Sequence, residues 1–266
     1  MTSARLFFVY NLVYIISMTP MTIEEKQKIA EFIDLTGDFI TSGYRGEKRE
    51  YNFSEAALPE EVPALSVSQI DYSSQNEDSL EKIAAEIKIC QSCPLAPTRK
   101  NTVPGEGVLN PLVLVIGEGP GADEDTQGRP FVGNAGQLLD QMLGAIKLSR
   151  NTNCFIANVV KCRPPKNRDP HPEEVISCAG FLKRQILFLK PKIILLVGNI
   201  ASQAVLKVKE PVGKIRGKFF DFKIDDLSIP LMVTYHPSAL LHNSDYKRPA
   251  WEDLKQLRAK IDSIDN

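Results

Sequence analysis

Residues 117–136 read GEGPGADEDTQGRPFVGNAG, and this stretch decides the fold. The residues before it, 111–116, are apolar and rich in β-branched side chains, which predicts a short buried strand. The residues after it, 137–146, repeat apolar side chains at helical spacing. The stretch is therefore a loop between a strand and a helix. In open α/β sheets such loops bind ligands, so we expect the active site here.

Strands and helices alternate along the rest of the chain. Strands are expected at 112–117, 154–160, 192–198 and 231–235, and helices at 79–89, 135–147, 173–189, 199–206 and 249–264. This alternation predicts an α/β fold with a parallel four-stranded sheet and helices on both faces. Residues 215–224 break the rhythm, and we expect an irregular strand or hairpin there at the sheet edge.

The N-terminal part of the chain lacks this alternation. Residues 6–16 are apolar but too short to cross a bilayer as a helix, and no signal-peptide cleavage site follows them. We therefore expect no membrane anchor and a natural start at Met18 or Met21, which makes 1–20 a non-native segment. Residues 21–78 are predicted to form a mostly helical or disordered extension with a polar linker, and residues 79–266 one domain.

The overall charge does not identify a partner. The formal net charge is -1 at pH 7, although a neutral total can hide a basic face. Basic side chains gather in loops beside the expected site, which favours a rim that contacts phosphates. They are Lys161, Arg163, Lys166, Arg168, Lys214, Arg216, Lys218, Lys247 and Arg248.

Four of the five cysteines have a pattern that suggests a metal centre. Cys154 lies among apolar neighbours and is interpreted as a buried thiol. Cys90 and Cys93 form a CxxC pair, and Cys162 and Cys178 could complete a site of four sulfurs. The spacing leaves zinc and an iron–sulfur cluster equally open, with structural disulfides a distant third.

Two polar residues are expected at the same sheet edge as the glycine-rich loop. His236 follows the last expected strand and is either a site residue or a surface or capping histidine. Asn158 lies near the end of the second strand. Its amide could read a planar ligand as donor and acceptor, or it could be a satisfied buried asparagine.

Taken together, the motifs resemble those of the family 4 uracil-DNA glycosylases, the iron–sulfur members of the uracil-DNA glycosylase superfamily. The resemblance covers about residues 80–264, with its motifs in the right order. The motifs are Cys90-x-x-Cys93, GEGPGADED (117–125), GRPFVG (128–133), NVVKCRPPKNR (158–168), Cys178 and YHPSALL (235–241). The resemblance implies a three-layer α/β/α domain. It also implies that the four cysteines of the motifs ligate a structural [4Fe–4S] cluster.

The resemblance further implies how uracil is read after the nucleotide leaves the DNA stack. Phe131 would stack on the base, and Asn158 would hydrogen-bond its polar edge. The backbone at Gly117, Glu118 and Gly119 would close the far side. His236 would donate a hydrogen bond to the uracil O2 as negative charge develops there.

The remaining implied roles concern water and the DNA duplex. Glu124 would orient the attacking water or stabilise the sugar cation, with Glu118 as the second candidate. Leu240 and Leu241 resemble the loop that enters the duplex where the base left, although they could simply pack on the core. Contacts to the DNA backbone are expected from Arg163, Lys166, Arg168 and Arg248.

The function predicted on this basis is removal of uracil from DNA by a monomeric, monofunctional glycosylase in the cytoplasm, associated with the nucleoid. The sequence lacks the Lys-Arg-Arg-Ile-His insertion of a relative that captures uracil covalently, so turnover is expected. Family 5 relatives lack the equivalent of Glu118. The alternatives are a non-catalytic iron–sulfur DNA-binding module and a redox sensor.

Overall fold

The structure is a computed structural model that describes residues 22, 28 and 78–265. The chain divides into two compact units, Met1–Tyr72 and Ser73–Asn266. The predictions for 1–20 and for nearly all of 21–78 lie outside the described residues. None of the described helices is both long enough and apolar enough to cross a membrane.

A single twisted sheet forms the centre of the second unit. Its strands are β1 (Glu106–Gly107), β2 (Val113–Gly117), β3 (Cys154–Asn158), β4 (Ile193–Val197), β5 (Phe219–Ile224) and β6 (Leu227–Thr234). Their order is β1-β3-β2-β4-β6-β5. The middle four are mutually parallel, as predicted, whereas β1 and β5 pair antiparallel at the two edges.

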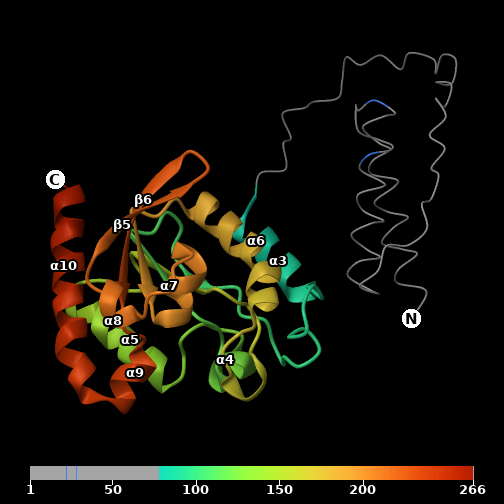
Figure 1. Ribbon diagram of the computed structural model, residues 1–266, viewed down its shortest axis with the longest axis horizontal. Helices are drawn as coiled ribbons and strands as arrows, with labels where there is room; N and C mark the ends of the chain where they lie inside the picture. The colour runs from blue at the N-terminus through green and yellow to red at the C-terminus, as the bar shows by residue number, and fades with distance from the viewer. Residues whose placement is uncertain (1–21, 23–27, 29–77, 266) are drawn as a thin grey trace, which may run out of the picture. The chain divides into compact units, whose positions relative to one another are not determined.

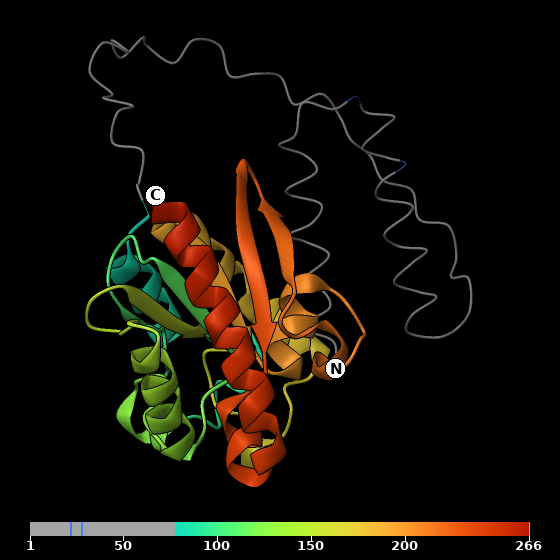
Figure 2. The ribbon, with the colours of Figure 1, turned by 90° about the vertical axis from the view of Figure 1, so that its left-hand side faces the viewer.

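The sheet therefore has six strands rather than the four expected. Strands β5 and β6 form a hairpin that projects from the sheet (Figure 2). Strand β1 is only two residues long, which is too short for a periodic sequence pattern to predict it. The irregular strand or hairpin expected at 215–224 is a strand over Phe219–Ile224, whereas Ile215 ends a helix. Its pairing extends β6 back to Leu227.

Helices cover both faces of the sheet (Figure 1). One face packs against α6 (Pro172–Leu189), α7 (Asn199–Leu206) and α8 (Val212–Ile215), with α3 (Leu80–Ile89) beside α6. The other packs against α5 (Asn134–Ala145), α9 (Pro237–His242) and α10 (Lys247–Asp265). This is the three-layer α/β/α arrangement.

The strand sequences explain why there are two cores. Side chains of a strand alternate between faces, and on β2 Leu114 and Ile116 join one core while Val113 and Val115 join the other. All five residues of β2, β3 and β4 are buried, as expected for parallel strands covered on both sides.

The strand register brings the expected site residues to one edge. Gly117 at the end of β2 is paired with Asn158 at the end of β3, and Val197 of β4 is paired with Thr234 of β6. His236 follows two residues after Thr234. The loop after β2 also contains a short helix, α4 (Ala122–Gln127), which the sequence analysis interpreted as irregular loop.

Candidate active site

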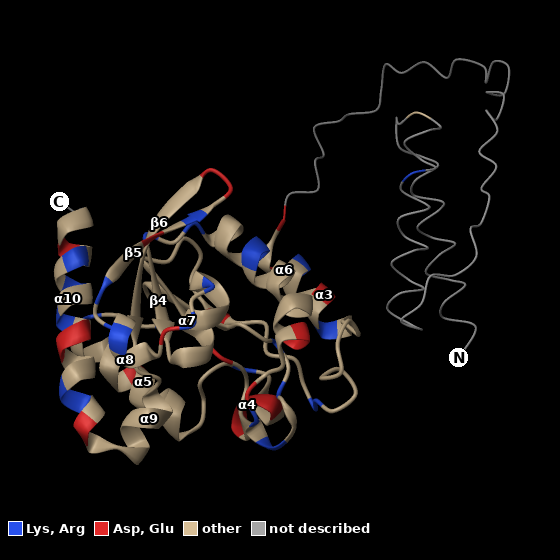
Figure 3. Ribbon diagram, in the orientation of Figure 1, with Lys and Arg blue, Asp and Glu red and all other residues tan. Residues whose placement is uncertain are grey.

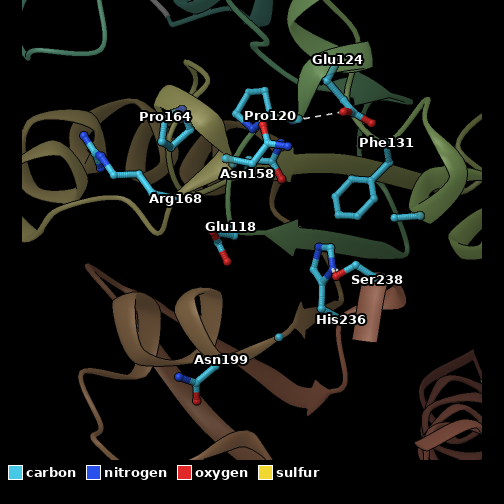
Figure 4. A pocket seen from close by; sticks show the side chains of 15 residues that line it. Glu118, Pro120, Glu124, Phe131, Asn158, Pro164, Arg168, Asn199, His236 and Ser238 are labelled. Atoms are coloured by element: carbon cyan, nitrogen blue, oxygen red, sulfur yellow. Dashed lines mark hydrogen bonds between the residues drawn. The ribbon is translucent and has the colours of Figure 1, made fainter. Parts of the chain in front are cut away.

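A pocket of about 330 Å³ lies at the carboxyl ends of the parallel strands (Figure 4). This volume is at the small end of ligand-binding sites and suits one small planar molecule. The lining residues come from the loops after β2, β3, β4 and β6. They are Glu118, Gly119, Pro120, Gly121, Glu124, Phe131, Ala135, Asn158, Pro164, Asn167, Arg168, Gly198, Asn199, His236 and Ser238.

The side chains of Phe131 and Asn158 both pack against the Cα of Gly117. A Cβ at Gly117 would lie 2.6 Å from the Asn158 Oδ1 and 2.6 Å from the Phe131 Cζ, so a side chain here would displace both. The Phe131 ring is almost fully buried, and its centroid is 5.5 Å from that of His236. The wall formed by Phe131 and Asn158 therefore depends on glycine at 117.

Asn158 carries an unsatisfied acceptor. The side chain is 1% exposed, and its Oδ1 is the buried side-chain polar atom without a partner in the part of the chain that the structure describes. Leaving a buried acceptor unpaired costs about 1–3 kcal/mol, which a ligand N–H would recover. The backbone is held firmly, because the buried Lys161 Nζ donates to the Asn158 carbonyl at 2.8 Å and to the Gln185 Oε1 at 2.7 Å.

His236 is held in one tautomer by Ser238, a residue that the sequence analysis did not single out. The Ser238 backbone N–H donates to Nδ1 at 3.2 Å, and the Ser238 hydroxyl lies 2.7 Å from the same atom. Burial lowers the pKa of His236 to about 4, against a weaker opposing effect of Glu124. The ring is therefore neutral at physiological pH, and its proton is on Nε2.

The two glutamates of the loop have different surroundings. Glu124 accepts hydrogen bonds from three backbone amides: Val132 at 2.9 Å, Gly133 at 3.0 Å and Gly121 at 3.1 Å. The Glu118 carboxylate receives no hydrogen bond from the described residues. Burial, with a smaller contribution from the nearby Asp169, raises the pKa of Glu118 to about 7. Glu118 is thus the carboxylate free to act on water or substrate.

The four cysteines of the motifs lie near one another. Cys90 and Cys93 follow α3, Cys162 follows β3, and Cys178 lies on α6. Burial raises the pKa of the Cys178 thiol, and the neighbouring thiols of Cys93 and Cys90 raise it further, opposing Lys161. Burial likewise raises the pKa of Cys162 to about 11.

This donor set fits an iron–sulfur cluster. Two of the sulfurs accept N–H bonds, Cys162 from Arg99 Nη1 and Cys178 from the Lys161 backbone, each at 3.3 Å. Such bonds to the sulfurs are part of how proteins tune clusters. Within residues 78–265, no three Cys, His, Asp or Glu side chains converge closely enough to hold a single ion. Cluster ligands bind separate irons, so they need not converge on one point.

The basic residues expected at DNA lie in two places. Arg163, Lys166 and Arg168 belong to the loop after β3, which forms one wall of the pocket. Arg168 is bound to the buried Glu174 by two hydrogen bonds of 2.7 and 2.9 Å. Arg248 is exposed near the start of α10, a helix that carries both basic and acidic residues (Figure 3).

Leu240 and Leu241 are adjacent on α9 but differ in burial. Leu240 is 3% exposed and packs in the core with α5 and α10, whereas Leu241 is 49% exposed. Only Leu241 is available to enter a DNA duplex without unpacking the core.

Comparisons with known proteins agree with this geometry. A family model described as the uracil DNA glycosylase superfamily matches residues 104–255. A type-4 uracil-DNA glycosylase of Pyrobaculum aerophilum is 44% identical over 66% of this chain and 91% of its own length. The type-4 enzyme of Saccharolobus solfataricus is 40% identical over 70% and 88%. A type-5 enzyme of P. aerophilum is 32% identical over 53% and 68%. The chain therefore belongs to the uracil-DNA glycosylase superfamily, within its type-4 family.

Proposed function

We propose that the protein removes uracil from DNA by hydrolysing the N-glycosidic bond of deoxyuridine, leaving an abasic site for repair. Residues 79–266 form the catalytic domain, acting as a monomer on DNA in the cytoplasm. The nucleotide must leave the stack to reach the pocket, since the reactive bond is inaccessible inside a duplex.

The unpaired Oδ1 of Asn158 is the observation that carries this proposal. Uracil presents an N–H next to a carbonyl along one edge, and an amide side chain matches this pair as acceptor and donor. Cytosine presents the reverse order at the same positions. Phe131 covers one face of the base, and the backbone at Gly117 to Gly119 closes the far side.

His236 supports departure of the base. Its Nδ1 is engaged by Ser238, so Nε2–H is the donor that faces the pocket. We infer that it donates to the uracil O2, where negative charge accumulates as the glycosidic bond breaks. A bond that strengthens in the transition state lowers the barrier, typically by about 2.7–4 kcal/mol.

Glu118 is the better candidate for positioning water. Glu124 already accepts hydrogen bonds from three backbone amides, which favours Glu118 for this role and leaves Glu124 as the second candidate. An ionised Glu118 would orient the attacking water and stabilise positive charge on the sugar. No lysine lines the pocket among the described residues, which supports hydrolysis without strand cleavage.

Cys90, Cys93, Cys162 and Cys178 would hold a [4Fe–4S] cluster. When bound, the cluster links the end of α3, the loop after β3 and α6, a structural role that needs no electron transfer. Replacing Cys162 by Ser should remove bound iron and visible absorbance together. Cys154→Ser is the matched control, because this buried thiol on β3 is outside the set and should leave iron content unchanged.

The test of the proposed activity is a glycosylase assay on an oligonucleotide carrying one U·G pair. Cleavage only after alkali establishes a monofunctional uracil-DNA glycosylase. Asn158→Asp should lose most of this activity, since a carboxylate cannot donate to the uracil O4. Absence of cleavage by the wild-type protein, with iron and DNA binding intact, would instead indicate the non-catalytic DNA-binding module.

A further inference from the structure

The backbone of Phe131 has an unfavourable conformation that must be held in place. Its φ is +51°, in the left-handed region that bulky side chains avoid. Such conformations cost about 1–3 kcal/mol and persist only where the surroundings enforce them. Phe131 forms a wall of the base pocket, so whatever enforces this conformation also sets where the aromatic ring lies.

Arg150 donates hydrogen bonds to the peptide carbonyls immediately before and after the Phe131 Cα. Its Nη1 donates to the Pro130 carbonyl at 2.7 Å, and its Nη2 donates to the Phe131 carbonyl at 2.9 Å. The Arg150 side chain is 8% exposed, and Asp140 Oδ1 accepts from its Nε and Nη2 at 3.1 and 2.9 Å. Three nitrogens of one planar group are therefore used at once, a pattern that lysine cannot reproduce.

The other side of the same loop is held by Glu124. Its carboxylate accepts from the amides of Val132 and Gly133, directly after Phe131. The loop is thus fixed by a buried cation on its carbonyls and by an anion on its amides. Gly136 adds a steric limit, because a Cβ there would lie 2.0 Å from the Phe131 carbonyl carbon and oxygen.

We propose that Arg150 is a positioning residue for uracil recognition, which holds the Phe131 ring against the base through the carbonyls of Pro130 and Phe131. This inference rests on the proposed function. Without the guanidinium the loop relaxes toward a less strained conformation, and the ring moves away from Gly117 and His236. Stacking on uracil weakens, although Arg150 itself does not line the base pocket.

The test compares Arg150→Ala with wild-type protein in two measurements: the dissociation constant of free uracil and the single-turnover rate on U·G DNA. We expect uracil affinity and rate to fall by about 10- to 100-fold, the scale of a displacement of about 1 Å in a site. Adding methylguanidinium ion should restore part of both in Arg150→Ala and neither in wild type. A purely structural role would lower thermal stability without rescue of uracil binding.

Arg129→Ala is the matched control. Arg129 precedes Pro130, and its side chain is 56% exposed. It pairs with Glu106, which also lies 3.9 Å from Arg150 Nη1, but it does not bond the loop carbonyls. Uracil affinity should be unchanged in this variant. If Arg150→Ala fails to fold, Asp140→Asn replaces it, since Asp140 is half exposed and orients the guanidinium. A smaller but measurable loss of uracil affinity is then expected.

The inference is overturned if folded Arg150→Ala, or Asp140→Asn in its place, binds uracil as tightly as wild type. The proposed function fails differently, because the wild-type protein itself would then neither bind nor release uracil. Both can therefore be judged from the same experiment.

Discussion

Glu118 and Glu124 belong to one loop and line one pocket, yet their carboxylates have opposite surroundings. Glu124 accepts hydrogen bonds from three backbone amides, which use three of its roughly four acceptor positions. Glu118 receives no donor from the described residues, and burial raises its pKa to about 7. A carboxylate that is hydrogen-bonded to several backbone amides fixes the conformation of the loop. A carboxylate in a pocket that receives no hydrogen bond from the protein remains available to substrate or water.

The same contrast holds for the rest of the site. Asn158 Oδ1 and His236 Nε2 have no hydrogen-bond partner among the described residues. By contrast, the His236 Nδ1, the Lys161 ammonium and the Arg150 guanidinium are each hydrogen-bonded to other protein atoms. We therefore expect substitutions of side chains with an unpaired atom in the pocket to change the rate of the chemical step. Substitutions of side chains that are hydrogen-bonded to other protein atoms should instead change the shape of the pocket.

The largest effect is expected for His236→Ala. Loss of a donor used mainly in the transition state should lower the single-turnover rate by about 10²–10³-fold, with DNA affinity nearly intact. Rapid-quench kinetics and binding of an abasic oligonucleotide separate the two quantities. An equal loss of DNA affinity would show that His236 acts in binding, and the contrast between the two kinds of group would then not hold at this residue.

Glu118→Gln should lower the rate by about 10²-fold, the usual scale for a group that orients water. In the wild-type protein kcat/KM should rise with pH through about 7, because the ionised carboxylate is the active form. His236 is already neutral above about pH 4 and cannot cause this rise. The variant should show a flat profile in this range.

Stability gives an independent check on Glu118. A carboxyl whose pKa is higher in the folded state contributes most to stability below its unfolded pKa, near 4.5, and that contribution is lost as pH rises through about 7. Relative to wild type, Glu118→Gln should therefore gain thermal stability between pH 5 and pH 8. A constant difference across this range would mean that Glu118 is not buried in the manner described.

Glu124→Gln makes the same atomic change in the same loop but should act on structure. In Glu124→Gln, the side-chain NH₂ would replace one carboxylate oxygen and face a backbone N–H, so that at least one hydrogen bond is lost. The free energy of unfolding should therefore fall by about 1.5–3 kcal/mol. Chemical denaturation measures this loss. Full stability combined with a 10²-fold slower rate would return the water-positioning role to Glu124.

The sequence predicted the buried strands and helices, which have periodic or continuous apolar patterns, and the residues at the ends of the strands. Buried parallel strands are continuous apolar runs, and the ends of β2, β3 and β6 necessarily meet at one edge. Gly117, Asn158 and His236 could therefore be placed near one another before any coordinates. The helix Asn199–Leu206 has the predicted bounds.

What the sequence did not predict depends on long-range contacts of single side chains. Nothing in the motif says that Glu124 accepts hydrogen bonds from backbone amides and Glu118 does not, since both belong to the same glycine-rich loop. Ser238 could have been found from its position two residues after His236, where an N–H can reach the ring at a helix start. Arg150 gave no signal, because its partners are backbone carbonyls about twenty residues earlier.

The smallest effect is expected from a comparison of Leu240 and Leu241, which separates duplex opening from core packing. Leu241→Ala should slow uracil release from double-stranded DNA by about tenfold or less, the effect of one missing wedge side chain. Single-stranded DNA should be processed at the wild-type rate, because it has no base stack to fill. Leu240→Ala should instead reduce the free energy of unfolding by about 2–5 kcal/mol and affect both substrates equally. Kinetics on matched single- and double-stranded oligonucleotides measure the ratio directly. If Leu241→Ala leaves the ratio of the rates on single- and double-stranded DNA unchanged, the exposed leucine does not enter the duplex. The role of α9 would then be limited to its N-cap, His236, and to the packing of Leu240 in the core.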